Sequence, residues 1–195
     1  MKTVKLPDEL NIDKSEFVKV FDYNSSLEIT KQQIILNQNT FSFLTDGTKE
    51  VFFDNSALSI DNSNFLLMKA GHCLMTEKLS DIKNYRSVLL FFTNETLLKI
   101  IRKAELNKTK PTENKSVYSF EYDEFIKRFV NSLLDITKLS KNIQEKLLDI
   151  KLEEIILYLT EIYGANFLHS LLTNTNDTNQ KIIQTVESNL LRSGI

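Results

Sequence analysis

The sequence is poor in the residues that build disulfides, phosphate-binding loops and metal sites. It has one cysteine, two histidines, four glycines and no tryptophan. Because Cys73 has no partner, an intrachain disulfide is impossible, and nothing favours an oxidising compartment. The glycines stand at positions 47, 71, 164 and 194 and form no cluster, which excludes a glycine-rich loop that cradles a phosphate.

Dense runs of charge and long apolar runs are also missing. The net charge is −2, and lysines and arginines form no basic stripe of the kind that nucleic-acid-binding proteins usually show. No segment approaches the roughly 18 apolar residues of a membrane-spanning helix. The N-terminal residues MKTVKLPDEL lack the apolar stretch of a signal peptide. We therefore expect a cytoplasmic protein with no membrane partner.

Apolar residues are plentiful enough for a core. They make up 42% of the 195 residues, and 13 of them are phenylalanine. A chain of this length fits one domain, or one domain plus an appendage.

The first half of the chain has the short alternating pattern of β-strands. Alternation is clear at Phe41 and Phe43, whereas residues 65–68 form a continuous apolar run, typical of a strand buried on both faces. Eight such segments, separated by polar turn-like clusters, predict a sandwich or a small barrel. They are residues 17–23, 32–36, 40–44, 49–53, 57–60, 65–70, 73–76 and 86–92. The polar segment before residue 15 is expected to be loosely held.

Helical spacing begins near Thr93, which can cap a first helix, as can Asn94. A polar loop, a short strand and further helices are expected after it. The loop covers residues 106–116, the strand 117–120, and the helices 125–136, 141–163, with Gly164 at its C-terminal end, and 165–172. Asp177 and Gln180 resemble a capping box that opens a last helix.

The helix over residues 141–163 carries apolar residues on two faces, and a surface helix of a monomer needs only one. One set steps by four and three residues, which is the pattern of a coiled-coil seam: Leu148, Leu152, Ile155, Leu159 and Ile162. A second set lies on nearly the opposite face: Ile143, Leu147, Ile150 and Leu157. The seam predicts a homodimer interface, and the alternative is a helix sandwiched inside its own domain.

Candidate catalytic and metal-binding residues are few. His72 and Cys73 are neighbours on a predicted strand, so their side chains point to opposite faces and cannot share one metal ion. The other histidine, His169, lies far along the chain. Cys73 has no adjacent base to activate it, which favours a buried structural thiol. We expect no metal, no cofactor and no catalytic residue, and therefore no enzyme.

A ligand pocket inside the barrel is a further possibility. An eight-stranded barrel is either filled by its own side chains or holds one small ligand. The candidate pocket consists of Phe41, Phe43, Phe53, Phe65, Lys69 and His72, and its phenylalanines could equally be plain core. Lys49, Lys69 and Lys78 could meet an anionic ligand at the barrel mouth, or be solvated lysines on strand edges.

Several segments resemble the regulatory domains of AraC-type transcription regulators. Residues 43–51 (FLTDGTKEV) are similar to the first conserved hairpin, and residues 58–71 (LSIDNSNFLLMKAG) resemble a barrel segment of that family. Residues 85–97 (YRSVLLFFTNETL) resemble its strand-to-helix junction. Residues 181–190 (KIIQTVESNL) resemble the first helix of its DNA-binding half. The nearest likeness is to the subgroup that includes type III secretion activators.

The resemblance implies an α+β fold, in which an N-terminal cupin-like β-barrel or jelly roll is followed by an α-helical dimerisation unit. The barrel would cover residues 15–120, the dimerisation unit 121–173, and a linker with the start of a missing DNA-binding domain 174–195. The His-x-His, Glu and His pattern of cupin metal sites is absent. Ligand residues vary between members of the family and are not carried over to this chain.

The resemblance also implies a function. The chain would sense a small molecule or a regulatory protein, pair with a second copy, and reach DNA only through a domain that it lacks. Two alternatives stay open: a cupin-type small-molecule binding protein or enzyme, and a purely structural interaction module.

Overall fold

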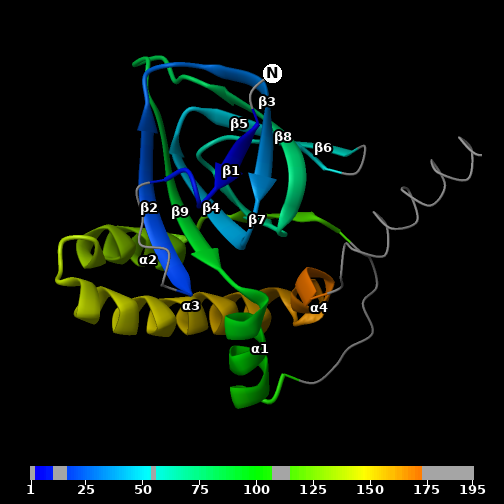
Figure 1. The fold of residues 1–195 in the computed structure, drawn as a ribbon, viewed down its shortest axis with the longest axis vertical. Coiled ribbons are helices and arrows are strands. Elements are labelled where there is room, and N and C mark those ends of the chain that lie inside the picture. Colours follow the sequence, from blue (N-terminus) through cyan, green and yellow to red (C-terminus); the bar gives the residue numbers. More distant parts are fainter. Residues whose placement is uncertain (1–2, 11–16, 54–55, 107–114, 173–195) are drawn as a thin grey trace, which may run out of the picture.

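The computed structural model describes residues 3–10, 17–53, 56–106 and 115–172. Two five-stranded sheets lie face to face, and the helices cover the outer side of one of them (Figure 1). Sheet A has the strand order β1-β3-β8-β5-β6, and sheet B has the order β10-β7-β4-β9-β2. The strands are β1 (Val4–Leu6), β2 (Val18–Ser25), β3 (Ile29–Leu36), β4 (Asn39–Asp46), β5 (Thr48–Phe53), β6 (Ser56–Ile60), β7 (Asn64–Met68), β8 (Gly71–Lys78), β9 (Tyr85–Phe92) and β10 (Val117–Glu121).

All eight strands predicted in the first half are present, and so is the short strand after the loop. The expectation of a loose N-terminal segment is wrong for residues 3–10. There β1 pairs in parallel with β3, and Leu6 stands opposite Leu36. Three residues are too few to show an alternating pattern in the sequence. The strand is recognisable only from its pairing with β3, about 30 residues further along the chain.

The turn between β4 and β5 requires its glycine. Gly47 has a φ of +88°, a conformation that side-chain-bearing residues rarely adopt. A Cβ atom there would also lie 2.5 Å from the carbonyl oxygen of Lys78. The Asp46-Gly47 turn signal in the sequence therefore has a steric cause.

Four helices follow the strand-rich half within the described residues: α1 (Asn94–Lys103), α2 (Glu124–Ile136), α3 (Lys141–Tyr163) and α4 (Asn166–Leu172). Thr93 caps α1, since its side-chain oxygen accepts the backbone N–H of Thr96 at 3.2 Å. Gly164 ends α3 with a φ of 75°, as predicted. The helix expected after Asp177 lies outside the described residues. No helix in the described part of the chain is both long and apolar enough to cross a membrane.

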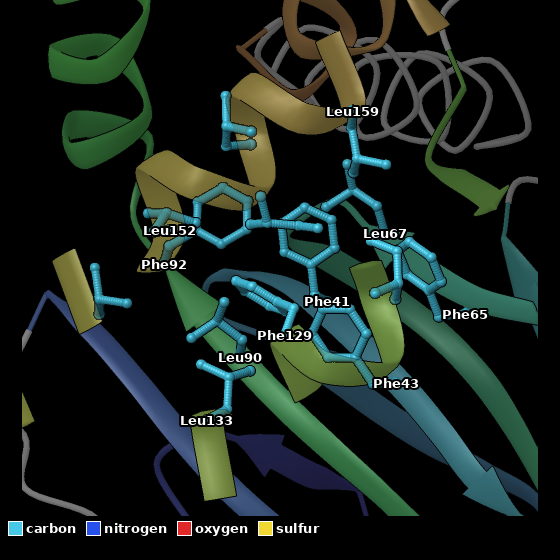
Figure 2. Packing of buried hydrophobic residues seen from close by; sticks show 14 of the residues in the cluster. Phe41, Phe43, Phe65, Leu67, Leu90, Phe92, Phe129, Leu133, Leu152 and Leu159 are labelled. Atoms are coloured by element: carbon cyan, nitrogen blue, oxygen red, sulfur yellow. The ribbon is translucent and has the colours of Figure 1, made fainter. Parts of the chain in front are cut away.

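The central strands of sheet B, β4, β7 and β9, are buried on both faces. Phe41 and Phe43 of β4 point toward the helices, while Ser42 and Leu44 point between the two sheets. Figure 2 shows the helix-side core, where strand residues meet residues of α2 and α3. Its labelled members are Phe41, Phe43, Phe65, Leu67, Leu90, Phe92, Phe129, Leu133, Leu152 and Leu159. Residues 65–68 of β7 are all apolar because both faces of this strand are buried.

The packing of α3 corrects the predicted dimer seam. Leu148, Leu152, Ile155 and Leu159 belong to the helix-side core and are at most 1% exposed. They contact their own chain and are not available to a partner, which is the internal alternative. Ile162, the fifth predicted residue, is 49% exposed. On the opposite face of α3, Ile143, Ile150 and Leu157 are between 40% and 59% exposed, whereas Leu147 is half-buried against the helix-side core.

Candidate functional site

A cavity of about 200 Å³ lies between the two sheets. Its walls are mostly apolar, and a small group of polar side chains reaches it from strands of both sheets. The lining residues are Val4, Leu6, Leu10, Tyr23, Ile29, Gln32, Ile34, Leu36, Thr40, Lys49, Met68, Met75, Glu77 and Leu89. A mainly apolar pocket with a few polar groups is typical of small-molecule sites.

Two charged residues are the main polar feature of the cavity. Lys49 shares the inward face of β5 with Val51 and Phe53, because alternate residues of a strand point the same way. Lys49 stands directly opposite Glu77 of β8 in the strand register. Their Nζ and Oε1 atoms are 3.4 Å apart, and the side chains are 3% and 6% exposed.

The Lys49 ammonium group has a second partner. It donates a hydrogen bond to Ser42 Oγ at 3.0 Å, and Ser42 Oγ lies 2.9 Å from Ser87 Oγ. A buried charge is tolerated only when it is paired and hydrogen-bonded. The Lys49 ammonium group is both paired and hydrogen-bonded, with Glu77 of sheet A and Ser42 of sheet B as its partners.

The carboxylate end of the pair is less completely satisfied. Glu77 Oε2 and the Tyr85 hydroxyl are both buried and make no hydrogen bond of ordinary length to a described residue, although both Tyr85 and Tyr23 are near enough to Glu77 for weak hydrogen bonding to it. Burial and then the Glu77 carboxylate raise the pKa of Tyr85 well above its usual value, and likewise raise the pKa of Tyr23. Both phenols are therefore protonated at neutral pH. The Tyr23 and Tyr85 rings meet edge to face, with centroids 5.8 Å apart.

The N-terminal segment closes one side of the cavity. Val4 and Leu6 come from β1, and Leu10 comes from the turn that follows it. The parallel pairing with β3 holds this wall, and Asn37 N–H donates to the Leu6 carbonyl at 2.8 Å.

The six predicted pocket residues do not form one site, and none of them lines the cavity. Phe41, Phe43 and Phe65 lie on the helix side of sheet B, so placing them in the barrel interior is corrected. The structure follows the alternative of plain core, because helices cover that face and the opposite parity of β4 faces the cavity. Phe53 does lie between the sheets, but it does not line the cavity.

The other two predicted pocket residues also lie away from the cavity. Lys69 is buried in the loop after β7, where its backbone N–H donates to the Ser116 carbonyl at 2.9 Å. His72 is exposed on the outer face of sheet A, in an open groove with Ile35, Phe52 and Leu74.

The sequence predicted Lys49 only as a contact at the barrel mouth or as a solvated lysine on a strand edge. It did not identify Glu77 as a candidate site residue. A signal was available for both. Lys49 has the parity of Val51 and Phe53, and Glu77 has the parity of Cys73 and Met75. Lys78, the third lysine considered, is exposed.

The described residues contain no group of three or more His, Cys, Asp or Glu side chains that could hold a metal ion. Burial raises the pKa of the Cys73 thiol to about 12, so the thiolate is negligible at neutral pH. The thiol is packed in the core between the sheets. The polar side chains that line the cavity are the Lys49–Glu77 pair, the hydroxyls of Tyr23 and Thr40, and the amide of Gln32.

Two facing sheets around a cavity of small-molecule size, with helices packed on one sheet, define a cupin-like α+β fold, as expected from the sequence. The family described as the ExsA N-terminal regulatory domain matches residues 39–171, which is well over half of the chain. The chain belongs to this family, and the expected likeness to AraC-type regulatory domains is confirmed. No curated protein matches the chain.

Solved structures of ToxT from Vibrio cholerae are similar to this chain. The apo K231A variant is 16% identical with a TM-score of 0.58, and covers 94% of this chain and 68% of its own. The wild type with bound unsaturated fatty acid is 17% identical with a TM-score of 0.54, and covers 94% and 66%. At this identity the likeness shows the fold. This chain spans about two thirds of the length of the ToxT chains.

Proposed function

We propose that this regulatory domain senses a small-molecule effector, which binds in the cavity between sheets A and B. The observation that carries the proposal is the cavity itself, which is about 200 Å³ in volume, mainly apolar, and supplied with a buried Lys49–Glu77 pair. A closed structural module has no need of such a space, since protein interiors are usually packed without voids of this size.

The comparisons support the proposal by analogy. ToxT, which shares the fold, has been solved with an unsaturated fatty acid and with (E)-4-(8-methylnaphthalen-1-yl)but-3-enoic acid. Both are largely apolar molecules with a polar head. A small molecule of mixed character is therefore the kind of effector that we propose for this chain.

Sheet B offers a route from the cavity to the helices. Thr40 lines the cavity, and its neighbour Phe41 packs in the helix-side core with residues of α3. A ligand that favours one arrangement of β4 thereby favours one arrangement of the helical layer, which is a population shift. Each tenfold preference of the ligand for one state shifts the equilibrium by about 1.4 kcal/mol.

We place the homodimer interface on the outward face of α3. Ile143, Ile150 and Leu157 are exposed and spaced by seven residues, which is the repeat that lets two helices pack along a seam. A second copy of the chain presents the same seam, so two copies are self-complementary about a two-fold axis. In this arrangement the strand-rich part of the chain senses, with Val4, Leu6 and Leu10 in one wall of its cavity, and the helical part that follows residue 120 pairs. We propose no catalytic step.

Methionine labelling tests the sensing proposal. Two of the three methionines, Met68 and Met75, line the cavity. With ¹³C-methyl methionine, an effector mimic should shift the signals of both residues in a saturable way. If no apolar compound with a polar head, fatty acids included, shifts either signal at millimolar concentration, the cavity is not an effector site, and the structural module gains support.

A further inference from the structure

We propose that the effector is a neutral, mostly apolar molecule with one hydroxyl group, and that this hydroxyl binds at Glu77. The inference rests on the proposed function, because it names the chemical class of the ligand that the same cavity takes. It differs from the acids bound by ToxT and follows from the charges and hydrogen bonds of this chain alone.

The charge balance of the cavity disfavours an ionised ligand. Lys49 and Glu77 neutralise one another at 3.4 Å, and both are buried. A carboxylate beside Lys49 would also face the Glu77 carboxylate, and an ammonium group beside Glu77 would face Lys49. Either ion would lose its hydration without gaining an unopposed partner. A head group without charge avoids this cost.

The hydrogen-bonding groups indicate a hydroxyl. Glu77 Oε2 is buried and makes no hydrogen bond of ordinary length to a described residue, and an ionised carboxylate oxygen can only accept. The phenols of Tyr23 and Tyr85 interact with the Glu77 carboxylate without closing such a bond to Oε2, so a further partner of Oε2 must be a donor. The protonated phenol of Tyr23 lines the same cavity. A hydroxyl both donates and accepts, so it can donate to Glu77 and accept from a phenol at once.

The volume and walls limit the rest of the molecule. Leu6, Ile34, Leu36 and Met75 are among the apolar side chains around the cavity. An apolar cavity of about 150 Å³ is enough to bind benzene. The cavity here, at about 200 Å³, suits an aliphatic or aromatic group of similar or slightly larger size. A C6 alcohol has this size and chemistry and serves as the probe.

A matched series of head groups provides the test. Hexan-1-ol, hexanoate and hexylammonium are titrated at pH 7.5 into the whole chain, and the Met68 and Met75 methyl signals report binding. We expect the alcohol to bind at least tenfold more tightly than either ion. The substitution Glu77→Gln should weaken the alcohol about tenfold. The control Glu50→Gln, on the outward face of β5, should leave its affinity unchanged.

If Glu77→Gln does not fold, the double variant Lys49→Met with Glu77→Leu replaces the pair by apolar groups of similar size. It should bind hexan-1-ol no more tightly than cyclohexane, whereas the wild type should prefer the alcohol. Tighter binding of hexanoate that depends on Lys49 overturns the inference and leaves effector sensing intact. Failure of all three probes to shift either methionine overturns both.

Discussion

Lys49 of β5 and Glu77 of β8 form an ion pair between the two sheets, with their charged atoms 3.4 Å apart. The two residues are register partners on adjacent strands, so the sheet holds them side by side. Each charge is tolerated in the interior because the other neutralises it, since a buried charge without a partner is strongly destabilising.

Breaking the pair should therefore cost far more than replacing it. The substitution Lys49→Met leaves the Glu77 carboxylate buried and unpaired, and should lower the free energy of unfolding by about 3–5 kcal/mol. The double variant Lys49→Met with Glu77→Leu should regain most of that loss. Urea denaturation at pH 7 measures both.

An exposed ion pair supplies the control. Lys103 contacts Glu153 at 2.8 Å, but its side chain is 70% exposed. The substitution Lys103→Met should lower the free energy of unfolding by less than about 1 kcal/mol. A similar loss for Lys49→Met would mean that water reaches the Lys49–Glu77 pair in solution.

Phe43 should matter for stability and not for ligand binding. Its ring centroid lies 5.0 Å from that of Phe65 and 5.7 Å from that of Phe129, on the helix side of sheet B. The substitution Phe43→Leu removes part of this packing and should lower the free energy of unfolding by about 1–2 kcal/mol. The affinity for hexan-1-ol, followed through Met75, should not change. If the Phe43→Leu variant folds but no longer binds hexan-1-ol, Phe43 contributes to the ligand site and this prediction is wrong.

The strand positions were predictable because alternation and turn residues are local properties. The faces were harder to assign, because the central strands of sheet B are buried on both sides and β4 is apolar on one parity and part of the inter-sheet layer on the other. The parity of Lys49 with Val51 and Phe53 was a local signal for an inward lysine, but the sequence interpretation did not use it. Its partner Glu77 is determined by the register of β5 with β8, which no local pattern contains.

The cavity itself was not predictable from the sequence. Its walls come from strands of both sheets and from β1, whose pairing with β3 joins segments about 30 residues apart. The two apolar faces of α3 were visible, but a sequence pattern does not say which face meets the chain's own core. Contacts with sheet B and α2, which join distant parts of the chain, decide that question, and in the structure the face of Leu148 and Leu152 makes them.

The outward face of α3 gives a test of dimerisation. The substitutions Ile150→Glu and Leu157→Glu place two charges on exposed positions, where they should not disturb the core. We expect a folded monomer, with a dimer dissociation constant raised at least tenfold, and a dimer for the wild type. Sedimentation velocity at tens of micromolar separates the two states, and circular dichroism verifies the fold.

The buried face of the same helix is the control. Leu152 is fully buried, so Leu152→Glu should unfold the protein instead of giving a folded monomer. If the double variant on the outward face sediments as the wild type does, a homodimer does not form through α3.

The N-cap of α2 predicts a pH dependence. Asp123 Oδ1 accepts the backbone N–H of Ile126 at 2.8 Å, and Asp123 also accepts the Tyr158 hydroxyl. Burial raises the pKa of Asp123, but the hydrogen bonds from Tyr158 and from backbone N–H groups outweigh it, and the pKa falls below its ordinary value. A lowered folded-state pKa means that the stabilisation is complete above the unfolded value of about 3.9 and is lost as the pH falls through the folded value.

The substitution Asp123→Ala should therefore lower the free energy of unfolding by about 1 kcal/mol at pH 7. The difference from the wild type should narrow below about pH 4, because the wild-type carboxyl is then increasingly protonated. Ser140, the N-cap of α3, makes no side-chain capping bond, so Ser140→Ala should cost less and show no such pH dependence. Urea denaturation at pH 7 and pH 3 measures all three proteins. An equal loss for Asp123→Ala at both pH values would show that the charge of the carboxylate does not stabilise α2.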